Sequence, residues 1–427
     1  MGREVVQVRG LVPHAPDAVW AVAGDFCAAW HPWIATIRAE RGPGGALVRA
    51  FTVTGEDTTY REQQTYLSDS DRTLGYTHLE GIRDCEAYDA RLTVSAAEAG
   101  GSVVIWTATI RAPAARLAEI CEGTRAVFQA GIAALASAAA PARTAVALPP
   151  PAPVETLIFD DLPRLAVSVT PDLGDGRLCL FLHGIGGGRT NWLAQLQAVG
   201  PTMRAAALDL RGYGDSTLGP VQSTVDDYCT DILRVADRLG ARRLVLVGLS
   251  YGSWIATSFA MRHPDRLEAL VLSGGCTGMS EAGPDEREAF RVSREVPLNA
   301  GQVPADFAPA VVKVLAGPSA SPETRQRLFD SMAAIPAATY RDALTCFTNP
   351  LERFDFSRLT MPVLLMTGDH DRLAPPAEIR GIAGRIWDCA PRPDVRFEVI
   401  PDAGHVCNVE QPEVYARHLL DLVARLA

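Results

Sequence analysis

A serine between two glycines is the first feature of this sequence that could do covalent chemistry. Residues 248–252 read Gly-Leu-Ser-Tyr-Gly, which is the G-x-S-x-G spacing of a nucleophile elbow. The glycines two positions either side of Ser250 leave room for a sharp, strained turn that presents the serine hydroxyl to a substrate. The flanking elements are those the turn needs. The aliphatic run 244–247 predicts a strand buried on both faces of a parallel sheet, and residues 254–262 predict a helix.

A serine hydroxyl is a weak nucleophile at neutral pH, so it needs a base and an acid that orients the base. Two downstream loops carry these residue types. The expected strand 363–366 precedes Asp369 and Asp371, and the expected strand 397–400 precedes His405. Because serine, acid and base follow one another in this order, each after a strand, the pattern predicts a nucleophilic triad.

Further motifs follow in order along the same part of the chain. They are His183 to Gly188 after an expected strand 178–182, Asp209 to Ser216 after 205–208, Gly368 to Asp371, and Gly404-His405 with Glu410 and Pro412 behind it. With these motifs, residues 156–427 resemble the α/β-hydrolase family of esterases, lactonases, carbon-carbon bond hydrolases and cofactor-free haloperoxidases. The resemblance implies Ser250 as nucleophile, His405 as base and Asp371 as acid, with Asp369 as the nearest rival for the acid.

An acyl-transfer reaction also needs donors for the oxyanion, each of which stabilises the tetrahedral intermediate by about 3 to 4 kcal/mol. We expect the backbone N–H groups of Tyr251, at a helix N-terminus, and Ile185 to supply them. The glycines 186–188 bring the backbone close to a ligand, make a tight turn, or do both. The resemblance implies that His183 serves the architecture of this loop. A serine at position 250 disfavours the haloalkane dehalogenase and epoxide hydrolase branches, which use a carboxylate nucleophile.

About ninety residues separate the expected strand 267–273 from the strand at 363, far more than a crossover needs. Four segments with helical spacing fall in this interval: 280–295, 304–316, 322–334 and 337–348. They resemble the family's helical cap, at about 277–358, and favour a small, mostly apolar acyl or ring-bearing substrate. The apolar residues that could line the pocket, or only pack the helices together, are Met279, Phe290, Phe307, Leu328, Phe329, Met332, Tyr340 and Phe347.

The first third of the chain predicts a separate domain, 1–140, joined by a Pro/Ala-rich linker at 141–155 to the hydrolase-like part at 156–427. Alternating segments at 5–9, 46–53, 90–94 and 102–110 predict antiparallel strands, and helices are expected near 15–20 and over 114–138. Together with aromatic and apolar positions such as Trp20, Phe26, Trp30, Trp33, Tyr88 and Trp106, they resemble the START-like polyketide cyclase/dehydrase (SRPBCC) helix-grip family.

The fold class expected is therefore an N-terminal α+β helix-grip domain and a C-terminal α/β-hydrolase domain with a mostly parallel sheet and a helical cap. For the N-terminal domain, ligand binding or substrate handover is the leading role, and cyclase or dehydratase chemistry is the runner-up. Polar groups that would have to converge in its interior for catalysis are Arg49, Glu62, Tyr60, Tyr76 and His31.

The bulk composition excludes several classes of partner. A net charge of -10 without a basic run argues against nucleic acid and anionic membrane surfaces. No apolar signal region and no stretch of about twenty apolar residues is found, which favours a cytoplasmic protein. Nine scattered cysteines without a C-x-x-C spacing predict reduced thiols, and neither a metal nor a cofactor is expected. The oligomeric state stays open.

Several functions fit these features. The first is a serine hydrolase that cleaves an ester or lactone through an acyl-enzyme. The second breaks a carbon-carbon bond beside a ketone carbonyl with the same three residues. The third is a non-catalytic ligand-binding protein, against which the presence of all of Ser250, Asp371 and His405 argues.

Overall fold

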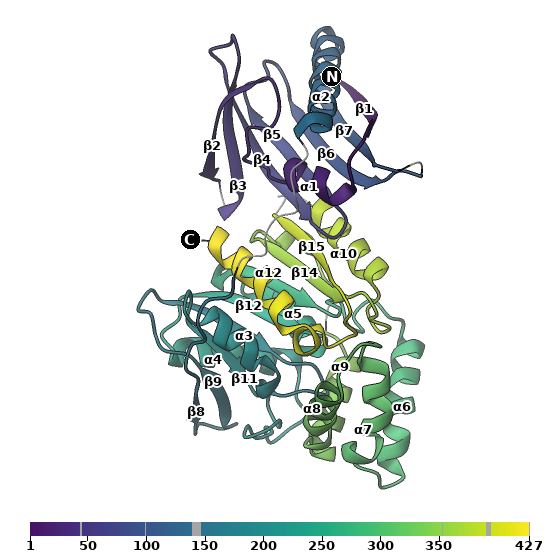
Figure 1. Cartoon of the computed structure of the whole chain (residues 1–427). Coiled ribbons are helices and arrows are strands. Elements are labelled where there is room, and N and C mark those ends of the chain that lie inside the picture. Colours follow the sequence, from purple (N-terminus) through teal and green to yellow (C-terminus); the bar gives the residue numbers. More distant parts are fainter. Residues whose placement is uncertain (43–44, 99, 139–146, 352, 390–393, 427) are drawn as a thin grey trace. The chain divides into compact units, whose positions relative to one another are not determined.

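The computed structural model describes residues 1–42, 45–98, 100–138, 147–351, 353–389 and 394–426 (Figure 1). The chain divides into two compact units, Met1–Ala145 with Ala390–Glu398 and Val146–Cys389 with Val399–Ala427. The predicted domain boundaries stay predictions, and residues 141–146 of the linker expected at 141–155 lie outside the described residues. Among the helices that the structure describes, none is both long enough and apolar enough to cross a membrane.

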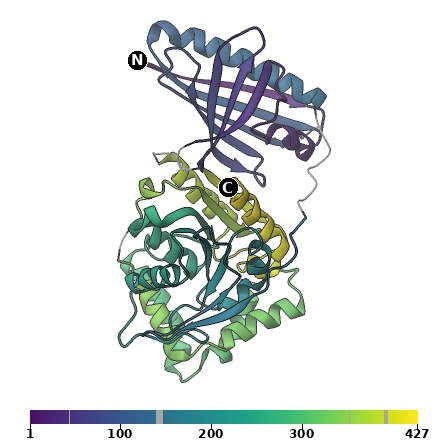
Figure 2. The ribbon, with the colours of Figure 1, turned by 90° about the vertical axis from the view of Figure 1, so that its left-hand side faces the viewer.

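The first unit is built on an antiparallel sheet with a long helix on one face (Figure 2). The strands, in spatial order, are β1 (Gly2–Val12), β7 (Ser102–Ala112), β6 (Ala87–Ala96), β5 (Thr73–Glu80), β4 (Thr59–Ser68), β3 (Leu47–Val53) and β2 (Ile34–Arg41). Helix α1 (Pro16–Ala23) follows β1, and α2 (Ala114–Ala138) covers the sheet. The indole of Trp106 on β7 stacks on Phe128 of α2 with 4.5 Å between ring centroids. This is the helix-grip arrangement expected from the sequence.

The second unit contains a mostly parallel sheet, as expected. Its strand order is β14 (Val363–Gly368), β13 (Leu267–Ser273), β12 (Arg243–Leu249), β10 (Arg177–Leu182), β11 (Ala205–Leu208), β9 (Leu165–Val169) and β8 (Glu155–Phe159). The strands from β14 to β11 are parallel, and β9 and β8 pair antiparallel at one edge. The core strands are buried along almost their whole length, which explains their uninterrupted aliphatic sequences. A further strand, β15 (Val395–Ile400), precedes the last two helices.

Helices surround this sheet and follow its strands in the order of an α/β fold. They are η2 (Arg189–Trp192), α3 (Leu193–Val199), α4 (Val225–Arg238), α5 (Tyr251–Arg262), η3 (Pro264–Arg266), η4 (Phe356–Arg358), α10 (Pro376–Asp388), α11 (Cys407–Glu410) and α12 (Pro412–Arg425). Four more helices, grouped together in Figure 1, lie between β13 and β14. These cap helices are α6 (Pro284–Asn299), α7 (Pro304–Leu315), α8 (Pro322–Ala333) and α9 (Ala337–Thr348).

Five strands lie outside the segments that the sequence predicted as strands: β2, β4, β5, β8 and β9. Strand β4 shows one reason. Its buried positions include Glu62, Gln64, Thr65 and Ser68, so the apolar alternation that marks a half-buried strand is missing from its sequence.

Candidate active site

Ser250 occupies the turn between β12 and α5 with φ 54° and ψ −114°, a left-handed conformation that a serine adopts only under constraint. A Cβ on Gly248 would lie 2.3 Å from the carbonyl oxygen of Gly252, and one on Gly252 would lie 2.3 Å from that of Leu182. Both positions therefore require glycine, because neighbouring backbone atoms occupy the space that a side chain would need. The amide of Ser250 donates to the carbonyl of Ser273 at 2.8 Å, which fixes the turn to the end of β13.

His405 and Asp371 form a buried pair. Nδ1 of His405 lies 2.9 and 3.0 Å from the two carboxylate oxygens of Asp371. The carboxylate also accepts hydrogen bonds from the amides of Leu373 at 2.8 Å and Ala374 at 2.9 Å, and from the hydroxyl of Thr367 at 3.2 Å. This set of donors fixes the position of the carboxylate beside the imidazole.

These contacts determine the charge on Asp371. Burial by itself would raise the pKa of this carboxyl, but the hydrogen bond and positive charge of His405, with the amides of Ala374 and Leu373, bring its pKa below the usual range. Asp371 is therefore ionised at neutral pH, and its oxygens accept the Nδ1 proton of His405. That tautomer leaves Nε2 as the basic nitrogen.

Nε2 of His405 is buried and has no hydrogen-bond partner among the described residues. A Cβ on Gly274 would lie 3.1 Å from Cε1 of the same imidazole. Gly274 directly follows Ser273, whose carbonyl accepts the hydrogen bond from the amide of Ser250. The imidazole and the elbow thus meet at the end of β13. No hydrogen bond joins Ser250 to Nε2 here, and such bonds are often long until substrate binds.

The loop after β10 lies against the serine. A Cβ on Gly184 would be 3.3 Å from Cβ and 3.8 Å from Oγ of Ser250. The amide of Gly187 donates to the carbonyl of Gly184 at 2.9 Å, so these glycines make a tight turn and also permit the close approach. Within the described part of the chain, the amides of Ile185 and Tyr251 donate no loop, turn or cap hydrogen bond. The hydroxyl of Tyr213 donates to the carbonyl of Ile185 at 3.0 Å and so orients that peptide.

His183 holds this loop in place. Its Nε2 accepts a hydrogen bond from the amide of Leu210 at 3.1 Å, so Nδ1 carries the proton and donates to the carbonyl of Gly184 at 2.8 Å. Burial lowers the pKa of His183, which keeps the ring neutral. Both nitrogens are occupied, so this histidine is unsuited to proton transfer.

Asp369, the rival for the acid, faces a different group. Its carboxylate accepts hydrogen bonds from the amides of Asp402 and Ala403, both at 3.1 Å. With His370 and Asp402 it forms an exposed group whose ligand atoms lie within 4.8 Å of one another, close enough to share a metal ion. Since Asp369 is already engaged by two amides, we assign the group to the structure of the turn.

Glu410 was expected from the sequence only as part of a motif, and its hydrogen bonds to two loops were not predicted. Its carboxylate accepts hydrogen bonds from the amides of Gly404 at 2.9 Å and Gly317 at 2.7 Å. The amide of His405 donates to the carbonyl of Leu315 at 2.7 Å. Glu410 therefore ties the loop that carries His405 to the connection between cap helices α7 and α8. No local signal could reveal this clamp, because Gly317 lies 93 residues before Glu410 in the chain.

The cap contributes aromatic and sulfur-containing side chains next to the elbow. Phe347 of α9 lies 5.7 Å from the ring of Tyr251 and 5.4 Å from that of Trp254, measured between centroids. A Cβ on Gly186 would lie 3.1 Å from the sulfur of Met332 in α8. Of the other expected pocket residues, Phe290 packs on Phe347, Phe307 packs on Tyr340, Leu328 and Phe329 join the hydrophobic core, and Met279 is buried.

Residues 178–412 match the family described as alpha/beta hydrolase fold. The chain belongs to this family. Residues 4–140 match the family described as polyketide cyclase / dehydrase and lipid transport. The chain thus joins an N-terminal SRPBCC domain to an α/β-hydrolase domain, as the sequence motifs predicted.

The hydrolase domain is similar over its whole length to several known proteins. It is 28% identical over 271 residues to the putative carbamate hydrolase RutD of Enterobacter cloacae, covering 61% of this chain and 97% of that protein. It is 27% identical to the putative 2-succinyl-6-hydroxy-2,4-cyclohexadiene-1-carboxylate synthase of Bacillus subtilis, covering 62% and 96%. Among solved structures, a thermophilic esterase from Thermogutta terrifontis is 27% identical with a TM-score of 0.54, covering 64% of this chain and 99% of that one.

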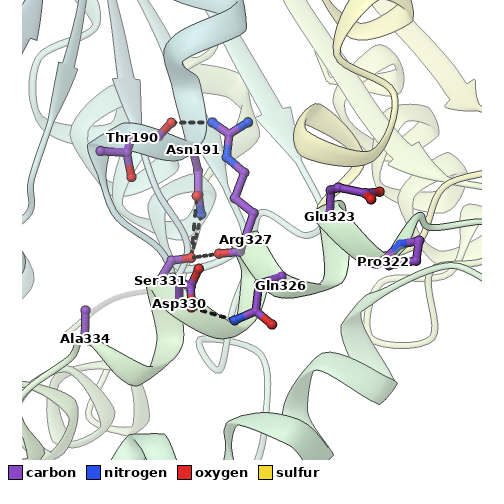
Figure 3. A pocket seen from close by; sticks show the side chains of 9 residues that line it. All are labelled: Thr190, Asn191, Pro322, Glu323, Gln326, Arg327, Asp330, Ser331 and Ala334. Atoms are coloured by element: carbon purple, nitrogen blue, oxygen red, sulfur yellow. Dashed lines mark hydrogen bonds between the residues drawn. The ribbon is translucent and has the colours of Figure 1, made fainter.

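A pocket of about 690 Å³ opens on the hydrolase domain between η2 and α8 (Figure 3). Seven of its nine lining residues carry polar side chains, and Ser250 is not among them. Arg327 donates to the carbonyl of Thr190 at 2.5 Å, and Ser331 meets the side chain of Asn191. Since Glu323 and Asp330 also line it, the pocket offers no clear preference for one charge, and we assign it no ligand.

In the SRPBCC domain, three of the five candidate residues come together. The guanidinium of buried Arg49 pairs with buried Glu62 at 2.6 Å and lies over the rings of Phe26 and Tyr76, 4.5 and 5.0 Å from their centroids. The hydroxyl of Tyr76 accepts a hydrogen bond from the indole of Trp106 at 3.1 Å.

Of the other two candidates, Tyr60 lies outside this group, and His31 borders it through the ring of Trp106, 6.4 Å away between centroids. The hydroxyl of Tyr60 donates to Glu56 at 2.7 Å on a part-exposed face. His31 contacts the carbonyl of Val127 at 3.0 Å, and burial lowers its pKa.

Proposed function

We propose that the chain is a serine hydrolase that cleaves a small, mostly apolar carboxylic ester or lactone through an acyl-enzyme. The observation that carries this proposal is the His405–Asp371 pair, whose basic Nε2 has no partner among the described residues and lies beside the strained elbow of Ser250. Buried nitrogens of this kind rarely persist without a role.

In the acylation step, Nε2 of His405 accepts the proton of the Ser250 hydroxyl as Oγ attacks the carbonyl carbon. Asp371 stabilises the imidazolium that results and keeps its Nδ1 proton in place. The amides of Ile185 and Tyr251 bind the oxyanion, each contributing about 3 to 4 kcal/mol. The imidazolium then returns the proton to the leaving alkoxide, and the C–O bond breaks to leave an acyl group on Oγ.

In the deacylation step, water takes the place of the alcohol. His405 removes a proton from the water, the resulting hydroxide attacks the acyl carbon, and the same amides bind the second oxyanion. Collapse of this intermediate transfers the proton from His405 to Oγ and releases the carboxylic acid. No cofactor is needed to balance either step.

Two lines of support bear on the substrate. The cap places Phe347 and Met332 beside the elbow and its oxyanion loop, which suits an apolar acyl group. Two proteins 27–28% identical to this domain are named an esterase and a putative carbamate hydrolase. Both names fit hydrolysis at a carbonyl carbon.

The proposal is tested on purified full-length protein with a panel of short-chain p-nitrophenyl esters and aliphatic lactones. We expect turnover of at least one class by the wild type and none above background by Ser250→Ala. If esters and lactones stay intact while a β-diketone is cleaved in a Ser250-dependent way, the carbon-carbon hydrolase alternative replaces this one.

We further propose that the SRPBCC domain binds a mostly apolar ligand that carries a polar oxygen. The buried Arg49–Glu62 pair, packed against aromatic rings, supports this, because charged groups are retained in an interior only at a cost that function commonly explains. The test is binding of a fluorescent fatty acid by the full chain. Arg49→Gln should weaken binding, whereas Arg61→Gln, which removes an ion pair with part-exposed Glu40, should not.

A further inference from the structure

Four buried polar atoms beneath the cap have no hydrogen-bond partner among the residues that the structure describes. They are the hydroxyls of Tyr228 and Tyr251, Oδ2 of Asp342 and the hydroxyl of Ser223. Tyr251 directly follows the proposed nucleophile, Tyr228 lies on α4, and Asp342 lies on cap helix α9. The two tyrosines are each 1% exposed and Asp342 is 9% exposed, so bulk water does not serve these groups.

The four atoms belong to two contacting pairs of residues, Tyr228 with Tyr251 and Asp342 with Ser223. Besides burial, the charge of Asp342 helps to raise the pKa of Tyr228. The rings of Tyr228 and Tyr251 meet edge to face with centroids 5.6 Å apart. Their hydroxyls approach each other, and that of Tyr251 approaches the thiol of Cys346 on α9, yet none of these contacts has the geometry of a normal hydrogen bond. Asp342 is held close by its other oxygen, which accepts a hydrogen bond from the amide of Ser223 at 2.9 Å.

An unsatisfied buried polar atom costs about 1 to 3 kcal/mol, and native structures contain few of them. Four such atoms on neighbouring residues, with Tyr251 directly after Ser250 in the chain, point to a group that binds there and satisfies them. The ring of Tyr251 also reaches the cap through Phe347, which places the cluster between the elbow helix and the roof of the site.

We propose that this cluster, named here the Tyr228–Tyr251 subsite, binds an uncharged hydroxyl group carried by the acyl part of the substrate. The proposal rests on the proposed serine hydrolase and adds to it the chemical class of its acyl group: a short hydroxyacyl chain that is otherwise apolar.

The hydrogen-bond donors and acceptors of the subsite indicate which chemical group of a ligand it can bind. Burial raises the pKa of both tyrosines, so their hydroxyls stay protonated and can donate. Asp342 can accept. A substrate hydroxyl satisfies both kinds of group at once, because it accepts from a tyrosine and donates to the carboxylate. A methyl group satisfies neither.

A carboxylate on the substrate is disfavoured by the charges around the subsite. Arg211 lies beside Tyr228, 5.6 Å from the ring centroid, but is already paired with Asp231 at 2.8 Å and Asp227 at 3.1 Å. A carboxylate on the substrate would bring a second negative charge next to that of Asp342. None of these residues offers an unpaired cation to balance it.

The test compares p-nitrophenyl butanoate with its 2-, 3- and 4-hydroxy derivatives, using the full chain. For the wild type we expect kcat/KM to be about fivefold or more higher for one hydroxylated ester than for the plain ester, the effect of one net hydrogen bond. Tyr228→Phe and Tyr251→Phe should each bring this ratio close to one, mainly by slowing the hydroxylated ester. The matched control is Tyr340→Phe, the same change on cap helix α9 at a ring that packs on Phe307, and it should keep the wild-type ratio.

Three results would overturn the subsite: a wild-type ratio near one at every position, no turnover of any hydroxylated ester, or a ratio that both phenylalanine variants leave unchanged. The last result, with altered unfolding midpoints, would indicate that water alone fills the cluster. Failure here is distinct from failure of the proposed function, because Ser250→Ala abolishes turnover of every ester only if the serine mechanism holds.

Discussion

His405 presents Nδ1 to both carboxylate oxygens of Asp371, at 2.9 and 3.0 Å, while Asp369, only two residues from Asp371, binds the amides of a different turn. This relationship favours Asp371, the acid that the resemblance implied, over its nearest rival Asp369. It also supplies a matched pair of substitutions.

Asp371→Asn is expected to reduce kcat by about a thousandfold or more, because an amide at this place favours the wrong tautomer of His405. Asp369→Asn should change kcat less than about threefold, because its role is confined to the turn at Asp402 and Ala403. Steady-state kinetics on one ester measure both. The assignment of the acid fails if Asp369→Asn is the more damaging change.

The lowered pKa of Asp371 predicts a pH dependence of stability. The unfolded carboxyl titrates near 3.9 and the folded one below that, so on acidification the unfolded chain binds the proton first. The stabilisation by Asp371 is therefore present above about pH 4 and is lost as the pH falls through the folded pKa. The urea midpoint of the wild type should exceed that of Asp371→Asn at pH 7, and the two should converge in acid. A constant difference from pH 7 to pH 3 would contradict this.

The elbow predicts that glycine cannot be replaced at position 252. Gly252→Ala would place Cβ 2.3 Å from a backbone oxygen of Leu182, so we expect loss of soluble, folded protein. Gly381→Ala on α10, where nothing lies within 4 Å, is the control and should stabilise by about 0.5 to 1 kcal/mol. Thermal unfolding followed by circular dichroism compares them. A folded Gly252→Ala protein with wild-type activity would show that the elbow is less constrained than its backbone indicates.

Much of the site could be predicted from the sequence because its residues belong to local motifs. Ser250 and its glycines form a five-residue pattern, and His405 follows a strand of recognisable composition. The Glu410 clamp and the Tyr228–Tyr251 subsite could not be predicted. Each joins side chains from elements far apart in the chain, and only the packing of α4, α5 and the cap brings them together. Strand β4 was missed for a related reason, since its buried Glu62 is stabilised by Arg49 on a neighbouring strand.

Glu410 is predicted to be a positioning residue for His405. Glu410→Ala frees the amides of Gly404 and Gly317, and we expect kcat to fall about tenfold or more, a larger change than in KM, because the loop that carries the base loses an anchor. Glu410→Gln keeps one acceptor and should recover part of the loss. Glu413→Ala, on the surface of α12, is the control. A rise in KM alone, or no rescue by glutamine, would refute the positioning role.

The buried pair in the SRPBCC domain predicts an asymmetry between single and double substitutions. Arg49→Met leaves Glu62 buried without its partner and should destabilise this domain by about 3 to 5 kcal/mol. Arg49→Met combined with Glu62→Met should cost much less. Chemical unfolding followed by tryptophan fluorescence measures both, and ester turnover by the hydrolase domain serves as an internal control. Additive losses in the double variant would contradict the pairing.

The central claim, that Ser250 is the nucleophile, is tested most directly by intact-mass and peptide mass spectrometry after treatment with a fluorophosphonate. We predict one covalent adduct per chain, located on Ser250, that forms far more slowly with His405→Ala and is absent from Ser250→Ala. An adduct on another residue, or equal labelling of the wild type and Ser250→Ala, would contradict the account.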